Sequence, residues 1–172
     1  MTINFARTRS QKKPSTASRG VRSLGIAIAI PVALTVSNIM MFGETDTFHY
    51  QDLDRPFWIP PLWALHLTCV SSAFVMGLSA WLVWADSGFH RTPTAIFMYL
   101  AQLGLGLAWD SIFFKVGPTR MGLGVSFGHM VTIFSCSRMF GRINPIAGDL
   151  VKLCLLWTLF LTFINLHFVL EE

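Results

Sequence analysis

A histidine stands among aromatic residues in an uncharged stretch that begins with a double proline. Pro60 and Pro61 suit the first turn of a helix, where backbone N–H groups have no partner. In that helix, spacings of three and four residues put His66 on one face with Trp63 and Phe74. A neutral imidazole between flat apolar walls offers the lone pair that haem iron takes as an axial ligand. We therefore predict that His66 ligates haem; the alternative is an imidazole hydrogen-bonded to a neighbouring helix.

Asp110 and His129 also place ionisable groups within apolar segments. Asp110 follows Trp109, which suggests a counter-ion or a proton relay. It lies four residues before the expected helix end at Phe114, so we favour an interfacial carboxylate. His129 has no acidic partner in its own segment, and a structural hydrogen bond is its expected role.

Side-chain amides and indoles supply further polar contacts. Gln102 and Asn165 can either bridge helices, at about 1 kcal/mol each, or line a pocket, and the sequence leaves both roles open. The tryptophans divide into two expected groups, an interfacial belt and a cavity lining. The belt is expected to hold Trp58 and Trp84, and the cavity Trp63, Trp109 and Trp157.

The chain carries no spacing typical of a catalytic centre. It lacks a metal-ligand motif, a nucleophile elbow and a phosphate-binding glycine loop, so we do not expect an enzyme. Its basic residues are not interleaved with aromatics, so a nucleic-acid partner is not expected either. The three cysteines fall in apolar segments and are expected to be reduced packing residues.

The composition is that of a membrane protein, with 53% hydrophobic and 13% charged residues. Five apolar segments are each long enough, at about 1.5 Å per residue, to approach the roughly 30 Å of a hydrocarbon core. We therefore predict an all-α integral membrane bundle of five transmembrane helices. The expected spans are residues 24–42, the segment from Pro60–Pro61 to Trp84, and residues 94–114, 121–140 and 146–170. In the fourth span, a small-residue face of Gly122, Gly124 and Gly128 predicts a close helix contact, within the bundle or across a dimer.

The domain organisation is a basic tail, residues 1–23, followed by the membrane domain, residues 24–172. The tail has six basic and no acidic residues and is expected to be disordered. We favour a role as a topology signal over binding to anionic lipid. An organelle transit peptide would have the same composition. Basic residues flanking the five spans place the N-terminus in the cytosol by the positive-inside rule.

Several motifs together resemble the tryptophan-rich sensory protein family, also called TspO/MBR or translocator protein. The resemblance covers residues 24–172 in register. Similarity to the plant branch lies in the basic tail, the sequence from Pro60 to His66 and the Trp109–Asp110 pair. The motifs are Trp58-Ile-Pro-Pro-Leu-Trp63, Met76-Gly77, Trp81-Leu-Val-Trp84, Tyr99-Leu-Ala-Gln-Leu103, Trp109 with Phe113-Phe114, Asn144-Pro-Ile-Ala-Gly148, and Trp157 with Asn165.

The resemblance implies a five-helix bundle, often dimeric, whose pocket takes porphyrins and haem, sterols or synthetic ligands. It implies roles from transport to stress-linked sensing and scavenging, and no settled enzyme activity. Trp63, Trp109, Trp157 and Asn165 match family positions that line or close the pocket. Plant-branch similarity favours the endoplasmic reticulum and Golgi; the tail also fits mitochondria or plastids.

Some positions depart from the family pattern. This chain has Leu67, Cys69 and Ala73 where many members have Pro, Trp and Tyr, Gly106 for a frequent Asn, and Leu153-Cys154 for a frequent Pro-Tyr. These departures weaken the expectation of a drug-type ligand profile. The sterol motif of the fifth helix needs a Tyr that is absent, so a sterol ligand is less favoured.

Two functions from different classes follow. The favoured one is a tetrapyrrole-binding protein, taking haem or porphyrin reversibly as a carrier, scavenger or stress-linked sensor. Its predicted site residues are His66 as the metal ligand, with Trp63, Trp109, Trp157 and Asn165. The alternative is a membrane interaction protein that docks another membrane protein and is regulated through a sterol- or lipid-binding pocket.

Overall fold

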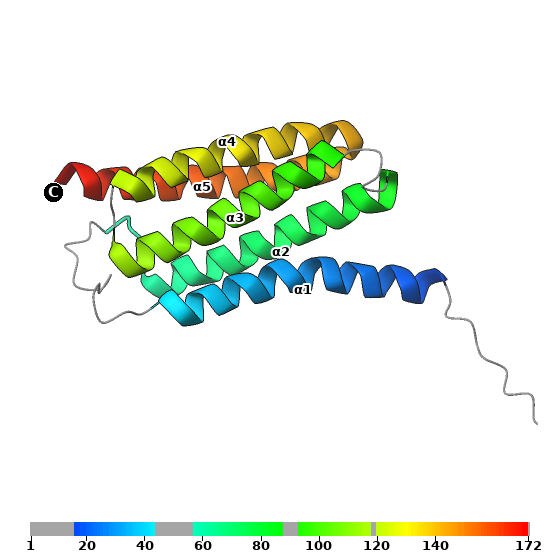
Figure 1. The fold of residues 1–172 in the computed structure, drawn as a ribbon, viewed down its shortest axis with the longest axis horizontal. Helices are drawn as coiled ribbons and strands as arrows, with labels where there is room; N and C mark the ends of the chain where they lie inside the picture. Colours follow the sequence, from blue (N-terminus) through cyan, green and yellow to red (C-terminus); the bar gives the residue numbers. More distant parts are fainter. Residues whose placement is uncertain (1–15, 44–56, 88–92, 118–119, 172) are drawn as a thin grey trace, which may run out of the picture.

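Five long helices make up the part of the chain that the computed structural model describes, which is residues 16–43, 57–87, 93–117 and 120–171. The expected all-α class is confirmed, and these residues contain no strand. Figure 1 shows the helices lying side by side along their length. They are α1 (Thr16–Phe42), α2 (Leu62–Ser87), α3 (Pro93–Val116), α4 (Arg120–Ile143) and α5 (Pro145–Glu171).

The predicted helix ends agree with the structure to within three residues, except at the start of α1. That helix begins at Thr16, so the last eight residues of the expected tail are helical. It also runs through Pro31 as one element. Residues 1–15 of the expected tail, and residues 44–56 and 88–92 between the first three helices, lie outside the described residues.

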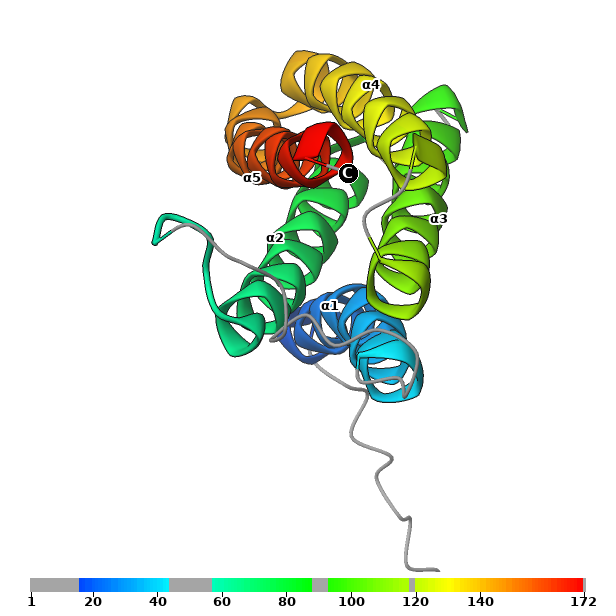
Figure 2. The same ribbon diagram turned by 90° about the vertical axis from the view of Figure 1, so that its left-hand side faces the viewer.

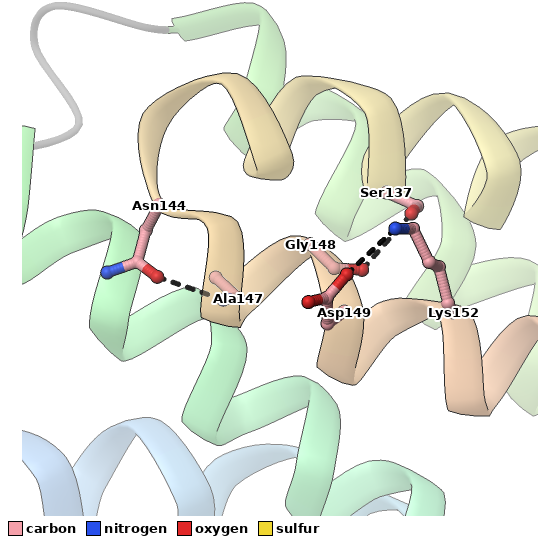
Figure 3. Close-up of polar contacts among 6 residues, drawn as sticks. All are labelled: Ser137, Asn144, Ala147, Gly148, Asp149 and Lys152. Carbon is pink, nitrogen blue, oxygen red and sulfur yellow. Dashed lines mark hydrogen bonds and ion pairs between the residues drawn. The ribbon is translucent and has the colours of Figure 1, made fainter.

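Local chemistry explains where α2 and α5 begin. Helix α2 starts directly after the double proline, and the carbonyl of Pro61 accepts the first N–H bonds, from Ala64 at 3.0 Å and Leu65 at 3.2 Å. Helix α5 starts after Asn144, whose Oδ1 accepts the N–H of Ala147 at 3.0 Å (Figure 3). Both starts follow from side-chain and proline positions that the sequence displays.

Among the described residues, four helices, α1, α2, α3 and α5, are long and apolar enough to cross a membrane. Helix α4 has a comparable length but is less apolar along that length. Its buried side includes Gly122, Ser126 and Ser137, which reduce the apolar character of the whole segment. An integral membrane protein is thus the natural class for this chain.

The helices close a ring in the order α1, α2, α5, α4, α3, with α3 packing back onto α1. The end view in Figure 2 shows α2 and α3 on opposite sides of the ring's interior. One apolar cluster fills the end of the ring near the α4–α5 turn, and a second, rich in aromatic residues, fills the other end. The space between these clusters is where a ligand site has room to form.

Two close helix contacts occur at glycines for which none was predicted. A Cβ on Gly148 would lie 2.5 Å from the Cα of Gly141, so α4 and α5 touch backbone to backbone (Figure 3 shows Gly148). A Cβ on Gly77 would lie 2.5 Å from the Ala27 carbonyl oxygen, so α1 and α2 are equally close. At Gly124, by contrast, a Cβ would meet no atom within 4 Å. The close contact predicted at Gly124 is therefore not made with any of the residues that the structure describes.

Candidate functional site: a cavity inside the helix ring

A cavity of about 70 Å³ lies inside the ring and is lined by side chains from all five helices. Its walls combine aromatic, small and polar residues. The lining residues are Thr35, Cys69, Ser72, Ala73, Met76, Gln102, Leu103, Gly106, Leu107, Trp109, Asp110, His129, Ile133, Cys154, Trp157, Thr158 and Leu161.

Helix α3 lines the cavity with residues at helical spacing. These residues include Gln102, Gly106 and Trp109. The Trp109 indole is buried and stacks on Phe113 with ring centroids 4.8 Å apart. Trp109, stacked on Phe113, therefore forms one side of the cavity.

Asp110 is buried in the ring and lines the cavity, while its expected position at the membrane interface stays a prediction. The residue is 8% exposed, and the Cys69 thiol donates a hydrogen bond to its Oδ1, with an S–O distance of 3.7 Å. The α3 end is covered because Ile59, before α2, packs into the aromatic cluster with Phe113 and Phe114. A carboxyl group therefore faces the centre of a membrane-type bundle, the placement that usually signals a ligand or proton role.

Polar N–H groups at the cavity are left without partners. The Gln102 Nε2 and Trp109 Nε1 atoms are buried and make no hydrogen bond among the described residues. The Trp157 N–H approaches the Cys69 sulfur but forms no hydrogen bond of ordinary geometry. An unsatisfied buried donor costs about 1–3 kcal/mol, so these groups favour an acceptor-bearing ligand or water in the cavity.

His129 is a histidine of the cavity wall. Its imidazole lies over the backbone of Gly106, because a Cβ there would sit 3.1 Å from Cε1 and 3.2 Å from Nε2 of the ring. The absence of a side chain at Gly106 therefore creates the space that the imidazole occupies. The sequence predicted a structural hydrogen bond for His129 and did not predict a place beside a ligand.

His66 and Trp63 are not among the cavity residues. The His66 ring packs edge-on against Phe114, with centroids 4.9 Å apart, and lies beside Gly43 at the end of α1. Trp63 is 69% exposed. The expected inner face of α2 was therefore wrong, although the ligand role of His66 stays a prediction. The observed inner face is rotated by about one residue and consists of Leu65, Cys69, Ala73, Met76, Ala80 and Val83.

Asn165 is buried in α5, with 0% exposure, and neither its Oδ1 nor its Nδ2 makes a hydrogen bond among the described residues. It does not line the cavity as the structure stands. The structure thus joins Trp109 and Trp157 in one site and leaves Asn165, His66 and Trp63 outside its wall. The helix bridge suggested for Asn165 is not made within the described residues.

The cavity residues that the sequence did not assign to a site include small ones. Cys69, Ala73 and Cys154 line the cavity, together with Gly106. The spacing of Cys69 and Ala73 in α2 was visible in the sequence, but the larger aromatic side chains of the neighbouring face outweighed it.

Comparison with known proteins agrees with this architecture. The model of the TspO/MBR family matches residues 20–170. The translocator protein homolog of Arabidopsis thaliana is 45% identical over 157 residues, which is 91% of this chain and 79% of that protein. The human translocator protein is 28% identical over 149 residues, 84% of this chain and 86% of that protein. The tryptophan-rich sensory protein of Cereibacter sphaeroides is 30% identical over 118 residues, 67% and 72% of the two chains. The chain belongs to the TspO/MBR family.

Proposed function

We propose that the protein binds haem or porphyrin reversibly inside the helix ring and serves as a membrane carrier, scavenger or stress-linked sensor of these tetrapyrroles. The observation that carries the proposal is a ring-enclosed cavity with the flat Trp109 and Trp157 indoles in its wall and the His129 imidazole beside them. Flat aromatic surfaces suit a planar macrocycle. The buried donors of Gln102 and Trp109 suit its acidic substituents.

The cavity must widen to take such a ligand. Its volume of about 70 Å³ is below the roughly 300–1,000 Å³ of ordinary small-molecule pockets. Helices α2 and α3 face each other across the interior and are not neighbours in the ring. Ala73 of α2 and Gly106 of α3, both small, line the cavity, and separation of these helices would break the Cys69–Asp110 contact of 3.7 Å. Ligand binding is therefore expected to move these two helices apart.

Two histidines are candidates for the axial ligand of haem iron. His66 is the residue predicted from the sequence, and it would serve a haem bound on the α1 side of α2, beside Phe114. His129 would serve a haem in the cavity itself. In either position one imidazole nitrogen would bind the iron, while Trp109 and Trp157 would hold the ring of a cavity-bound tetrapyrrole.

Titration of the purified protein with ferric haem and with metal-free porphyrin tests the proposal. His129→Ala should lose most haem affinity and change the absorption bands if the ligand is in the cavity, and His66→Ala should do so if it is beside α1. His167→Ala, next to Trp58 at the far end of α5, is the matched control. Metal-free porphyrin gains nothing from an axial bond and should bind all three variants equally.

Trp109→Ala decides whether the cavity is the binding site at all. This change removes one flat wall, so both haem and metal-free porphyrin should bind at least tenfold more weakly, a loss of about 1.4 kcal/mol. Unchanged binding of both ligands to Trp109→Ala would refute tetrapyrrole binding in the cavity. If the two histidine variants also bind haem with the parent spectrum, axial ligation is refuted as well.

We also infer that α4 is a fifth span, with the N-terminus in the cytosol. Its 24 residues would extend about 36 Å, and it packs lengthwise between α3 and α5. Five spans place the tail and the C-terminus on opposite sides of the membrane. Protease added to the cytosolic side of sealed vesicles should remove the tail and spare a C-terminal tag; loss of the tag with retention of the tail would reverse the orientation.

The host membrane that we propose is the endoplasmic reticulum and Golgi, on the ground of plant-branch similarity. Imaging of a C-terminal fusion, which leaves the basic tail free, tests it directly. Fluorescence in mitochondria or plastids would instead make the tail an organelle address.

A further inference from the structure

A second hollow, of about 380 Å³, lies on the outside of the ring between α1 and α3. It is lined by apolar and aromatic side chains, including Ile26 and Ile30 of α1, Trp81 and Trp84 of α2, and Tyr99 of α3. Leu103 lines both this groove and the inner cavity and therefore stands between them. The groove is open to the surroundings of the bundle, which in a membrane are lipid chains.

The groove is built into the packing of the helices. At the end nearest Phe42, α1 is tied to α3: Asn38 Nδ2 donates to the Leu107 carbonyl at 3.0 Å, and Ser111 Oγ donates to Asn38 Oδ1 at 2.8 Å. Toward its N-terminus, α1 is tied to α2, because the Trp81 N–H donates to Ser23 Oγ at 3.1 Å. Helix α1 is thus fixed to α3 near Phe42 and to α2 near Ser23. The groove between α1 and α3, with Trp81 of α2 in its lining, lies toward the N-terminal end of α1.

The N-terminal end of the groove is basic. Arg19 and Arg22 are exposed on α1 and precede Ile26 and Ile30 at spacings of three and four residues, so they share the groove side of the helix. From Arg22 to Pro31, which also lines the groove, the helix rises about 13.5 Å, close to half of a roughly 30 Å hydrocarbon core. The apolar groove, which we also call the slot, is therefore about one leaflet deep, and the guanidinium groups of Arg19 and Arg22 lie at its N-terminal end.

We propose that this groove is a binding site for one anionic phospholipid. One acyl chain lies in the slot between α1 and α3, along Ile26, Ile30 and Trp81. The phosphate lies at Arg19 and Arg22, whose planar guanidinium groups pair with phosphate oxygens through two parallel hydrogen bonds. The combination of slot and charge distinguishes this site from the general attraction of basic tails to membranes, because the chain and the headgroup are both recognised.

Native mass spectrometry of the full chain in detergent tests the proposal. The protein is titrated with phosphatidylglycerol and with phosphatidylcholine of the same acyl chains. Each juxtamembrane arginine contributes about 1 kcal/mol, so Arg19→Gln/Arg22→Gln should bind phosphatidylglycerol roughly thirtyfold more weakly. Arg138→Gln/Arg142→Gln removes the same charge from the end of α4 on the same side of the bundle, and should bind as the parent does.

A second pair of variants tests the slot. Ile26→Trp places a bulky ring in the groove and should remove tightly held lipid of either headgroup, whereas Val36→Trp, elsewhere on the exposed surface of α1, should not. The proposal is overturned if the two double-arginine variants lose lipid equally, if both headgroups bind equally to the parent, or if Ile26→Trp retains the lipid. The same mass spectra would show a sterol bound to the purified protein. A bound sterol that is lost in Ile26→Trp and kept in Arg19→Gln/Arg22→Gln would also overturn the proposal, in favour of a sterol site.

Discussion

The two sides of α2 differ in the size and polarity of their residues. The side that faces the cavity carries the small residues Cys69 and Ala73, both buried. The other side carries Trp63, His66 and Phe74, of which Trp63 and Phe74 are exposed on the bundle surface. In a water-soluble protein the larger apolar side chains would mark the interior. In a membrane the lipid accepts them equally well, so size does not indicate the buried side.

Helix α3 shows what does indicate it. Its cavity side carries Gln102 and Asp110, both buried. A polar group facing lipid is costly, so polarity marks the interior of a membrane helix more reliably than bulk. Polarity does not decide between the two sides of α2, because Ser79 is completely buried whereas His66 lies on the side that does not line the cavity.

The largest expected effect is at Gly77, where α2 meets α1. A Cβ there would lie 2.5 Å from the Ala27 carbonyl oxygen and 2.9 Å from the Ile28 Cα, so the helices must move apart. Gly77→Ala should lower the free energy of unfolding by about 1–3 kcal/mol, measured by thermal or denaturant unfolding in detergent. Gly104→Ala, where a Cβ meets nothing within 4 Å, is the control and should be neutral or slightly stabilising. Equal loss in both variants would show that α1 and α2 are not closely packed.

The next effect is on ligand binding at the cavity side of α2. Ala73→Leu adds three carbon atoms beside a cavity of about 70 Å³ and should fill much of it. Porphyrin affinity should fall at least tenfold, about 1.4 kcal/mol, while the folded state tolerates the added volume. Phe74→Leu, on the exposed side, is the matched control. Titration of both variants with metal-free porphyrin measures the difference, and a larger loss in Phe74→Leu would place the ligand outside the ring.

A smaller effect is expected at Trp63, which family resemblance assigns to the pocket. Because its side chain is 69% exposed, Trp63→Ala should change the free energy of unfolding by less than about 0.5 kcal/mol. Porphyrin affinity should remain that of the parent if the ligand lies in the cavity. A strong loss of affinity would instead support a site on the outer side of α2, near His66, and would reverse the comparison of the two sides.

Most of the fold could be predicted from the sequence because helix ends are local. Except at the start of α1, apolar length, the double proline before Leu62 and the Asn144-Pro145 pair fix where helices begin and end within a few residues. The rotation of each helix about its axis is not local, because it depends on which neighbours the ring places beside it. Trp109 and Trp157 line the cavity as expected. The cavity positions of Cys69, Asp110 and His129 needed the structure, because they depend on how each helix is rotated.

The smallest effect on the folded chain is expected at Gly124, the outward counterpart of Gly77. Helix α4 presents Gly124 on its exposed surface, where a Cβ would meet no atom within 4 Å, so Gly124→Leu should leave the unfolding temperature of the monomer unchanged. If the bundle forms a homodimer through this small-residue face, as we propose from the sequence, the leucine would hold the two backbones apart. The particle mass in detergent, measured by light scattering, should then fall from dimer to monomer for Gly124→Leu but not for Gly104→Ala. A dimer that persists in Gly124→Leu would show that this face contacts lipid. The close backbone contacts at Gly77 and Gly148 would then have no counterpart at Gly124.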